Sequence, residues 1–246
     1  MQSIFKQTAK VINKSNHLTA FTGAGISVES GIPPFRGENG IWNKFNPEIF
    51  DLNFFISHPK EVWKFVYEVF YKTIYNTTPN KAHYALAKLE EKQILKAIIT
   101  QNIDNLHFKA GSKNVYEFHG NTRQANCLDC GKKYEIKDIN LSVLPPKCTC
   151  NGILKPDFVF FSEPIPADVL TKSFKEAEIA DVFLIIGTTG VIYPAAQIPI
   201  LAKQNGSKII EINIEPSEYT NTITDIFIQA KASIAMEQIL QLLENC

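Results

Sequence analysis

Residues 18–37 read LTAFTGAGISVESGIPPFRG, and this stretch decides the fold. An apolar run that reaches Phe21 and then meets Gly23-Ala24-Gly25 is typical of the first strand and turn of a dinucleotide-binding domain. The glycines there let the backbone approach a pyrophosphate. The third small position of that fingerprint holds Val28, and residues 31–34 (GIPP) end any helix soon afterwards. The sequence therefore predicts a nucleotide-binding turn whose following helix is cut short.

Strand-like apolar runs recur along the chain and alternate with helical patterns such as residues 81–91. The strand-like runs are LTAFTG (18–23), ILKAIITQN (94–102), VYEFHG (115–120), VFLIIGTTG (182–190) and KIIEINIE (208–215). This alternation predicts an α/β fold, a Rossmann-like parallel sheet with helices on both faces.

Two segments interrupt the alternation. Residues 37–78 are rich in aromatic side chains and predict a helical insertion, whereas residues 121–154 hold four of the five cysteines and a Pro145-Pro146 pair that does not suit the main sheet. We therefore expect a Rossmann-like NAD-binding domain made of residues 1–36, 79–120 and 155–246, a helical insertion and a small zinc-binding module.

The composition narrows the class of protein. The 246 residues carry 25 basic and 25 acidic side chains, so the overall charge gives no reason to expect a nucleic acid or an acidic membrane as partner. The first residues fit one face of a helix rather than a signal peptide, and no apolar run approaches the roughly 20 residues of a membrane span. We expect a monomeric cytoplasmic protein.

The cysteines form two pairs, Cys127 with Cys130 and Cys148 with Cys150, separated by residues 131–147. Two such pairs supply four thiolates for a tetrahedral zinc ion. Such a site has no open position, so we expect a structural metal. The second pair has one intervening residue instead of two and needs a tighter loop. Cys246, at the terminus, is taken as unrelated.

Polar residues follow the predicted strands at their carboxyl ends, where ligands bind in a parallel sheet. They are residues 23–27, 101–104, His119-Gly120, 187–189 and 213–215. Each has a plainer interpretation by itself. The glycine turn suits any strand-to-helix connection, His119 could be structural, and Asp104 could cap the following helix. Their convergence on one crevice favours a shared function.

In combination, GAGIS, SGIPPFRG, TQNIDNLH, FHG, the two cysteine pairs, KPDFVFFSE, GTTGVIYPAA and INIE resemble the sirtuins, NAD-dependent protein deacylases, in a compact bacterial-type form. The motifs cover nearly the whole chain in the family's order. The resemblance also explains the short helix, because in that family a mobile loop takes its place and covers the nicotinamide ribose.

The resemblance implies a reaction in which the amide oxygen of an acylated lysine attacks the ribose carbon that carries nicotinamide. His119 would be the general base on a ribose hydroxyl, and Asn102 and Asp104 would hold the nicotinamide end as the other catalytic residues. Phe35 would shield the reactive carbon and Arg36 would steady the loop. Nicotinamide, free lysine and an acylated ADP-ribose would be the products.

The same resemblance implies the remaining contacts. The expected NAD-binding residues are Gly23, Ala24, Gly25, Ile26, Ser27, Phe35, Arg36, Gln101, Asn102, Ile103, Asp104, Gly187, Thr188, Thr189, Asn213, Ile214, Glu215 and Ala232. The expected substrate-binding residues are Val66, Val69, Val159, Phe160, Phe161 and Val191.

The chain departs from its relatives at the acyl pocket. Sirtuins that remove succinyl or malonyl groups carry a Tyr and an Arg at the positions counted here, from Val62-Trp63, as Val66 and Val69; both are apolar. We therefore expect neutral acyl groups, acetyl or longer, to be preferred over succinyl. If the helical register is shifted by a turn, Tyr67 or Tyr71 would face the pocket instead.

Two other departures are smaller. Ser162 stands where the family's peptide-docking strand usually has glycine, which alters the backbone freedom there. Thr189 replaces a frequent serine and keeps the hydroxyl.

Two competing functions share these motifs. Mono-ADP-ribosyl transfer would use the same NAD cleavage, but members specialised for it often lack the base histidine. An NAD-binding sensor without turnover would lose polar crevice residues that this chain keeps. A dehydrogenase is disfavoured, because no acidic residue follows the glycines at the distance that grips the adenosine ribose.

Overall fold

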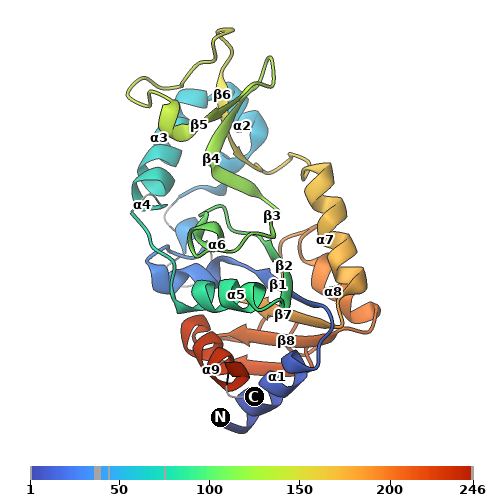
Figure 1. Ribbon diagram of the computed structural model, residues 1–246. Helices are drawn as coiled ribbons and strands as arrows, with labels where there is room; N and C mark the ends of the chain where they lie inside the picture. The colour runs from blue at the N-terminus through green and yellow to red at the C-terminus, as the bar shows by residue number, and fades with distance from the viewer. Residues whose placement is uncertain (1, 36–39, 44, 75, 245–246) are drawn as a thin grey trace.

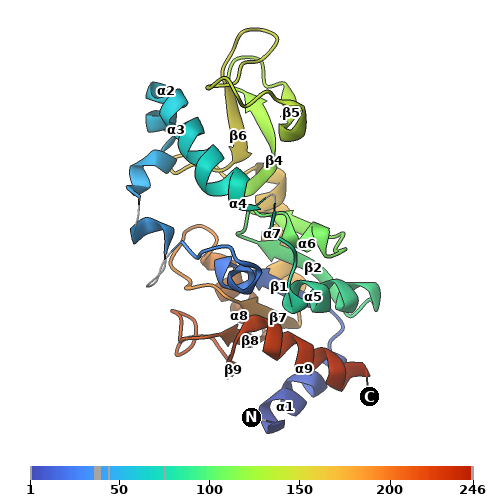
Figure 2. The same cartoon turned by 90° about the vertical axis from the view of Figure 1, so that its left-hand side faces the viewer.

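The computed structural model describes residues 2–35, 40–43, 45–74 and 76–244. Two parts are stacked along the long axis of the molecule, and both termini lie at the far end of the larger part (Figures 1 and 2). The larger part contains a six-stranded sheet and the smaller part a three-stranded sheet. No helix in these ranges is long and apolar enough to cross a membrane.

The six-stranded sheet is parallel throughout and has the order β3-β2-β1-β7-β8-β9. Its strands are β1 (Leu18–Thr22), β2 (Leu95–Thr100), β3 (Val115–Glu117), β7 (Val182–Ile186), β8 (Lys208–Asn213) and β9 (Ile226–Gln229). The chain runs outward from β1 in one direction and from β7 in the other, so the strand order reverses between these two neighbours. In an open parallel sheet this reversal is where ligands bind.

Helices cover both faces of this sheet. On one face lie α1 (Gln2–Asn13), α5 (Lys81–Glu91) and α9 (Ala232–Glu244), packed on side chains such as Ala20, Leu184 and Ile210. On the other lie α7 (Ala167–Ile179) and α8 (Gln197–Gln204), packed on Phe183 and Ile209. Buried strands with alternate side chains in two cores explain the nearly continuous apolar runs. The predicted α/β fold is confirmed.

The connection after β1 is a short 3-10 helix, η1 (Ala24–Ser30). It ends at Gly31, whose φ of +91° lies in the left-handed region that glycine adopts at low cost. The predicted interruption of the first Rossmann helix is thus present in the structure.

The smaller part combines both interrupting segments. Its antiparallel sheet has the order β5-β4-β6. The strands are β4 (Gly120–Cys127), β5 (Lys133–Glu135) and β6 (Leu154–Phe158), and the helices are η2 (Ile41–Asn43), η3 (Pro47–Phe50), α2 (Leu52–Ser57), α3 (Pro59–Val66), the π-helical turn η4 (Tyr67–Tyr71), α4 (Lys72–Ile74) and η5 (Ile136–Asp138). The small sheet therefore extends to Phe158, past the residue 154 at which the sequence placed the limit of the zinc module.

Aromatic side chains join the helical insertion to the small sheet. Phe50, Phe55 and Trp63 share one core with Phe158 and Phe160. The Trp63 indole Nε1 also donates a 2.7 Å hydrogen bond to the carbonyl oxygen of Leu154. Two segments separated in sequence thus form one packed unit above the large sheet (Figure 2).

Candidate active site and metal centre

Two glycine turns meet at the strand reversal. The amide of Gly25, after β1, donates a 2.8 Å hydrogen bond to the carbonyl of Gly187, after β7. A Cβ added to Gly25 would lie 2.6 Å from Gly187 Cα, and Gly187 has a φ of +64°. The glycines are therefore required for the close approach of the two turns to each other, as well as for any approach of a ligand.

Backbone donors remain available at the same turns. Within the described residues, the N–H groups of Ala24, Thr188 and Thr189 make no hydrogen bond to another backbone group. Unpaired amides at a helix start and in a glycine turn form an anion-binding concavity. This chemistry fits the pyrophosphate of NAD.

A buried polar cluster lies behind these turns. Asn102 donates from Nδ2 to the Gly23 carbonyl and to Ser27 Oγ, at 3.1 Å each, and Ser27 Oγ donates to Asp104 Oδ2 at 2.7 Å. Asp104 Oδ1 also accepts from the backbone of Leu106, at the start of α6 (Leu106–Lys109), at 2.9 Å. Asp104 thus accepts from the first N–H of that helix and belongs to the cluster. Burial raises its pKa, and the bond from Ser27 opposes that shift.

His83, which the sequence analysis missed, supports this cluster from α5. Its Nδ1 accepts a 3.3 Å bond from the backbone N–H of Asn80, in the capping box of the helix. A backbone N–H only donates, so the neutral ring carries its proton on Nε2, 3.5 Å from Ser27 Oγ. Burial lowers the pKa of His83 to about 4. The one available sequence signal was the Asn80 cap with its partner three residues on.

His107 packs beside His83, with 5.0 Å between the ring centroids. Its Nε2 lies 2.9 Å from Thr22 Oγ1, which donates to Thr100 Oγ1 at 2.9 Å. Thr100 Oγ1 in turn accepts from the backbone N–H of Asn102 at 3.1 Å. This buried chain fixes the backbone where the predicted catalytic residues begin.

His119 lies at the end of β3 with one nitrogen engaged. Its Nδ1 is 3.0 Å from the carbonyl oxygen of Gln101, which only accepts, so Nδ1 carries the proton and Nε2 presents a lone pair. No described residue bonds to Nε2. Burial lowers the pKa of His119, while the bond to Gln101 acts in the opposite direction. A neutral ring with a free Nε2 is suited to accept a proton.

Gln101 and Asn213 connect the neighbouring strand ends. Gln101 donates from Nε2 to Thr188 Oγ1, and Asn213 donates from Nδ2 to the Thr188 carbonyl, both at 3.0 Å. The ends of β2, β7 and β8 thus meet at Thr188, and the sequence predicted that these strand ends converge on one crevice. Thr189 is exposed beside it.

The other predicted NAD-binding residues differ in exposure. Ile26 is fully buried in the core of the large sheet, so its side chain cannot contact a ligand in this structure. Ile103 and Phe35 are half-buried against the small part, Ile214 and Glu215 are exposed, and Ala232 is buried at the start of α9. Arg36 lies outside the described residues.

The predicted substrate residues also divide by burial. Val66 and Phe160 lie inside the small core, Val69 and Val159 are half-buried, and Phe161 and Val191 are 46% and 39% exposed. Val69 falls within the π-helical turn η4, a type of turn frequent at functional sites. Tyr71 is buried and Tyr67 half-buried. The acyl-pocket roles of these residues stay predictions.

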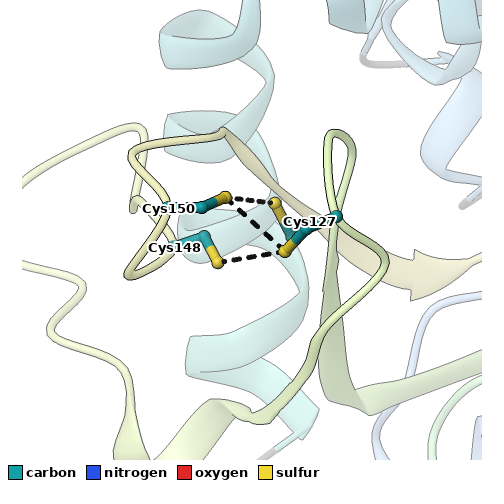
Figure 3. A group of neighbouring side chains, drawn as sticks. Cys127, Cys148 and Cys150 are labelled. Carbon is teal, nitrogen blue, oxygen red and sulfur yellow. Dashed lines mark hydrogen bonds between the residues drawn. The ribbon is translucent and has the colours of Figure 1, made fainter.

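The four predicted zinc ligands form one cluster, of which Figure 3 labels Cys127, Cys148 and Cys150. All four Sγ atoms lie within 4.8 Å of one another. The Sγ of Cys150 is 3.5 Å from those of Cys127 and Cys130, and Cys130 Sγ is 3.6 Å from Cys148 Sγ. A tetrahedral zinc with thiolates at about 2.3 Å requires sulfur separations of about 3.8 Å. The donor set therefore fits one structural zinc ion, Cys150 included.

Local backbone features shape this cluster. Gly131 and Asn151 adopt φ of +71° in the two cysteine loops. A Cβ on Gly152 would lie 2.7 Å from Cys127 Sγ, so only glycine fits there. The hydroxyl of Tyr134 lies 3.1 Å from Cys148 Sγ and orients that ligand.

Comparison with known proteins agrees with this geometry. The model of the Sir2 family matches residues 23–194. An NAD-dependent protein deacylase of Pyrococcus furiosus is 45% identical over 242 residues, covering 96% of each chain. NAD-dependent protein deacylase 2 of Pyrobaculum aerophilum is 43% identical over 235 residues, covering 95% of this chain and 93% of the relative.

Solved structures match over nearly the whole chain. The crystal structure of a Sir2 homologue in complex with NAD has a TM-score of 0.91 and 40% identity, covering 98% of this chain and 94% of that one. A Sir2 complex with a p53 peptide and NAD has a TM-score of 0.91 and 35% identity, covering 98% and 99%. The resemblance drawn from the sequence is confirmed: the chain belongs to the Sir2 family, which includes the NAD-dependent protein deacylases named above.

Proposed function

We propose that this chain is an NAD-dependent protein-lysine deacylase that releases nicotinamide and O-acyl-ADP-ribose. The observation that carries this function is the geometry of His119. Its protonated Nδ1 is held by Gln101, and its free Nε2 lies at the strand ends where the Asn102, Ser27 and Asp104 cluster begins. Family membership supplies the reaction class, and this site supplies the groups for it.

NAD, when bound, supplies a ribose carbon whose bond to nicotinamide breaks as the acyl oxygen of the substrate attacks. Asn102 and Asp104, both buried, would hold the nicotinamide end. His119 Nε2 accepts a proton from a ribose hydroxyl. The amides of Ala24, Thr188 and Thr189 hold the pyrophosphate. Because an amide oxygen is a weak nucleophile, these positioning contacts supply much of the rate.

The environment of His119 fixes the pH response. Burial lowers its pKa below the usual 6.5, so the ring is neutral and able to accept a proton at pH 7. Activity that depends on this base falls only as the pH drops through the lowered value. The acidic limb of the rate profile therefore lies below pH 6.5.

We further propose that neutral acyl groups are the preferred substrates. The Val69 side chain is half-buried and carries no charge, and Val66 is buried among apolar residues. An acidic acyl tail would leave its carboxylate without a cationic partner at these two positions, which disfavours its binding. We also propose a monomeric, cytoplasmic protein without nucleic-acid partners; the balanced charge of the chain supports the last of these points.

The test is nicotinamide release from NAD with matched acetyl, butyryl, myristoyl and succinyl lysine peptides. We expect release that depends on the acyl group, with succinyl the poorest substrate. His119→Asn should lower kcat by about 10²-fold or more, whereas His58→Asn, at an exposed histidine of the small part, should leave it unchanged. Release that ignores the peptide would contradict deacylation, and equal turnover of succinyl and acetyl peptides would contradict the acyl preference.

A further inference from the structure

Ser162 occupies a backbone position that costs a non-glycine residue energy. Its φ is +68°, in the left-handed region where a Cβ meets the following carbonyl. Ser162 is exposed, so no core packing explains a side chain there. What the side chain does have is a 2.7 Å hydrogen bond from its Oγ to Asp51 Oδ2.

Asp51 already has a separate task. Its Oδ1 accepts from the backbone N–H groups of Asn53 and Phe54, at 2.8 and 3.3 Å, and so caps α2. One carboxylate thus caps a helix of the insertion with one oxygen and holds Ser162 with the other. The bond from Ser162 is the largest influence that lowers the pKa of Asp51, so the carboxylate is charged and the bond is charge-assisted.

Residues 159–161, which directly precede Ser162, are held at both ends by backbone hydrogen bonds. At one end the Val159 N–H donates to the carbonyl of His119 at 2.9 Å. At the other, the Phe161 N–H donates to the Phe50 carbonyl at 2.7 Å, and the Phe161 carbonyl accepts from Leu52 at 3.1 Å. Residues 159–161 therefore bridge the candidate base and the helical insertion, and Phe161 remains 46% exposed.

We propose that the Ser162–Asp51 hydrogen bond is a latch that positions residues 159–161 for the acylated peptide and so sets the affinity for it. This role rests on the proposed function, in which Val159, Phe160 and Phe161 contact the substrate. Ser162 and Asp51 act through that segment and are positioning residues. Without the Ser162–Asp51 bond, residues 159–161 keep the backbone bonds of Phe161 to Phe50 and Leu52 and the packing of Phe160 on Phe50 and Phe55.

Three variants distinguish a positioning role of the Ser162–Asp51 bond from a role in stability alone. Ser162→Ala keeps the Cβ and loses the bond, Ser162→Gly loses the bond and removes the backbone cost, and Asp51→Ser keeps an oxygen able to cap α2 but is too short to reach residue 162 as well. Ser57→Ala is the matched control, because Ser57 is an exposed serine of α2 whose hydroxyl bonds only to Asn53 within the helix.

The measurements are steady-state kinetics with an acetyl-lysine peptide and amide hydrogen exchange of residues 50–54 and 159–163. All three variants should raise the peptide KM about threefold to tenfold, leave kcat and the NAD KM within about twofold, and exchange faster in both segments. The Ser57→Ala protein should match the parent. Ser162→Gly is decisive, because a purely structural serine would be improved or unaffected by glycine.

An unchanged peptide KM in Ser162→Ala and Asp51→Ser would overturn the latch. An unchanged exchange rate would overturn it equally, since the segment would then be held without the bond. If the parent protein releases no nicotinamide with any acylated peptide, the proposed function fails instead. Hydrogen exchange would still report whether the bond holds the segment.

Discussion

Different interactions stabilise the large part and the small part of the molecule. The large sheet is buried between two aliphatic cores, and its polar groups lie at the strand ends. The small part packs aromatic side chains around short strands and relies on four cysteines in its loops. Apolar burial is the main source of stability in the first, whereas a bound metal would fix the loops of the second. In the proposed function the first part supplies the catalytic and NAD-binding residues and the second part supplies most of the substrate contacts, so each part can be tested by its own variants.

The largest effect should come from removing zinc. Cys127→Ser, or chelation of the metal, should abolish acyl-dependent nicotinamide release and expose residues 120–158 to hydrogen exchange, while residues 182–213 stay protected. Zinc content and exchange, measured on the same sample, provide the test. Cys246→Ser, which the sequence places far from both pairs, should keep its zinc. Equal loss of protection in the large sheet would show that the two parts do not differ as described.

Gly187 tests the large part at the strand reversal. Gly187→Ala places a Cβ 2.4 Å from the Ile26 backbone nitrogen at a φ of +64°, and should cost about 2 to 5 kcal/mol and raise the NAD KM. Gly206→Ala is the matched control: its φ is +93°, but no atom lies within 4 Å of the added Cβ. The Gly206→Ala protein should lose only the stability that a non-glycine residue costs at positive φ, about 1–2 kcal/mol. Denaturant unfolding of both proteins makes the comparison, and equal losses would refute the role of close approach.

His83 makes the stability of the large part depend on pH. In the unfolded chain it takes up a proton near its usual pKa of 6.5, whereas the folded protein keeps it neutral down to about pH 4. Its contribution to stability is therefore complete above pH 6.5 and is lost as the pH falls toward 4, by about 3 kcal/mol. His83→Gln keeps an acceptor for the capping box and should flatten that part of the profile. If the His83→Gln protein shows the same loss of stability between pH 6.5 and pH 4, other groups cause that loss.

The smallest effect concerns the contact that joins the insertion to the small sheet. Trp63→Phe removes the donor to the buried Leu154 carbonyl and should destabilise the small part by about 1–2 kcal/mol. Chemical denaturation followed by hydrogen exchange in residues 154–158 measures it. If Trp63→Phe leaves the stability of the small part unchanged, aromatic packing alone joins the two segments.

The sequence predicted most where one local pattern determines one feature. Apolar runs ending in polar residues predicted the parallel sheet and the convergence of its strand ends, and paired cysteines predicted the metal cluster. Gly31 and the prolines after it predicted the short helix after β1. These features depend on neighbours in the chain, so one sequence suffices to read them.

Contacts between distant elements could not be predicted in this way. His83 lies in a helix that reads as an ordinary amphipathic segment, and only folding brings it 3.5 Å from Ser27. Ile26 follows the glycine turn that resembles a ligand-binding turn, yet its side chain is buried in the core. Glu211, buried within β8, accepts hydrogen bonds from the hydroxyls of Ser217, Thr220 and Thr224. The only sequence signal for its burial was the position of an acidic residue within an apolar strand.

The central claim is that the acyl group leaves the lysine and is transferred to ADP-ribose. Mass spectrometry of the peptide and the nucleotide, after incubation of an acetyl-lysine peptide with NAD and the zinc-loaded protein, tests it most directly. We predict a peptide lighter by its acetyl group, together with an acetylated ADP-ribose in equal amount, and neither product with His119→Asn. A peptide or protein that instead gains ADP-ribose and keeps its acetyl group would contradict the account.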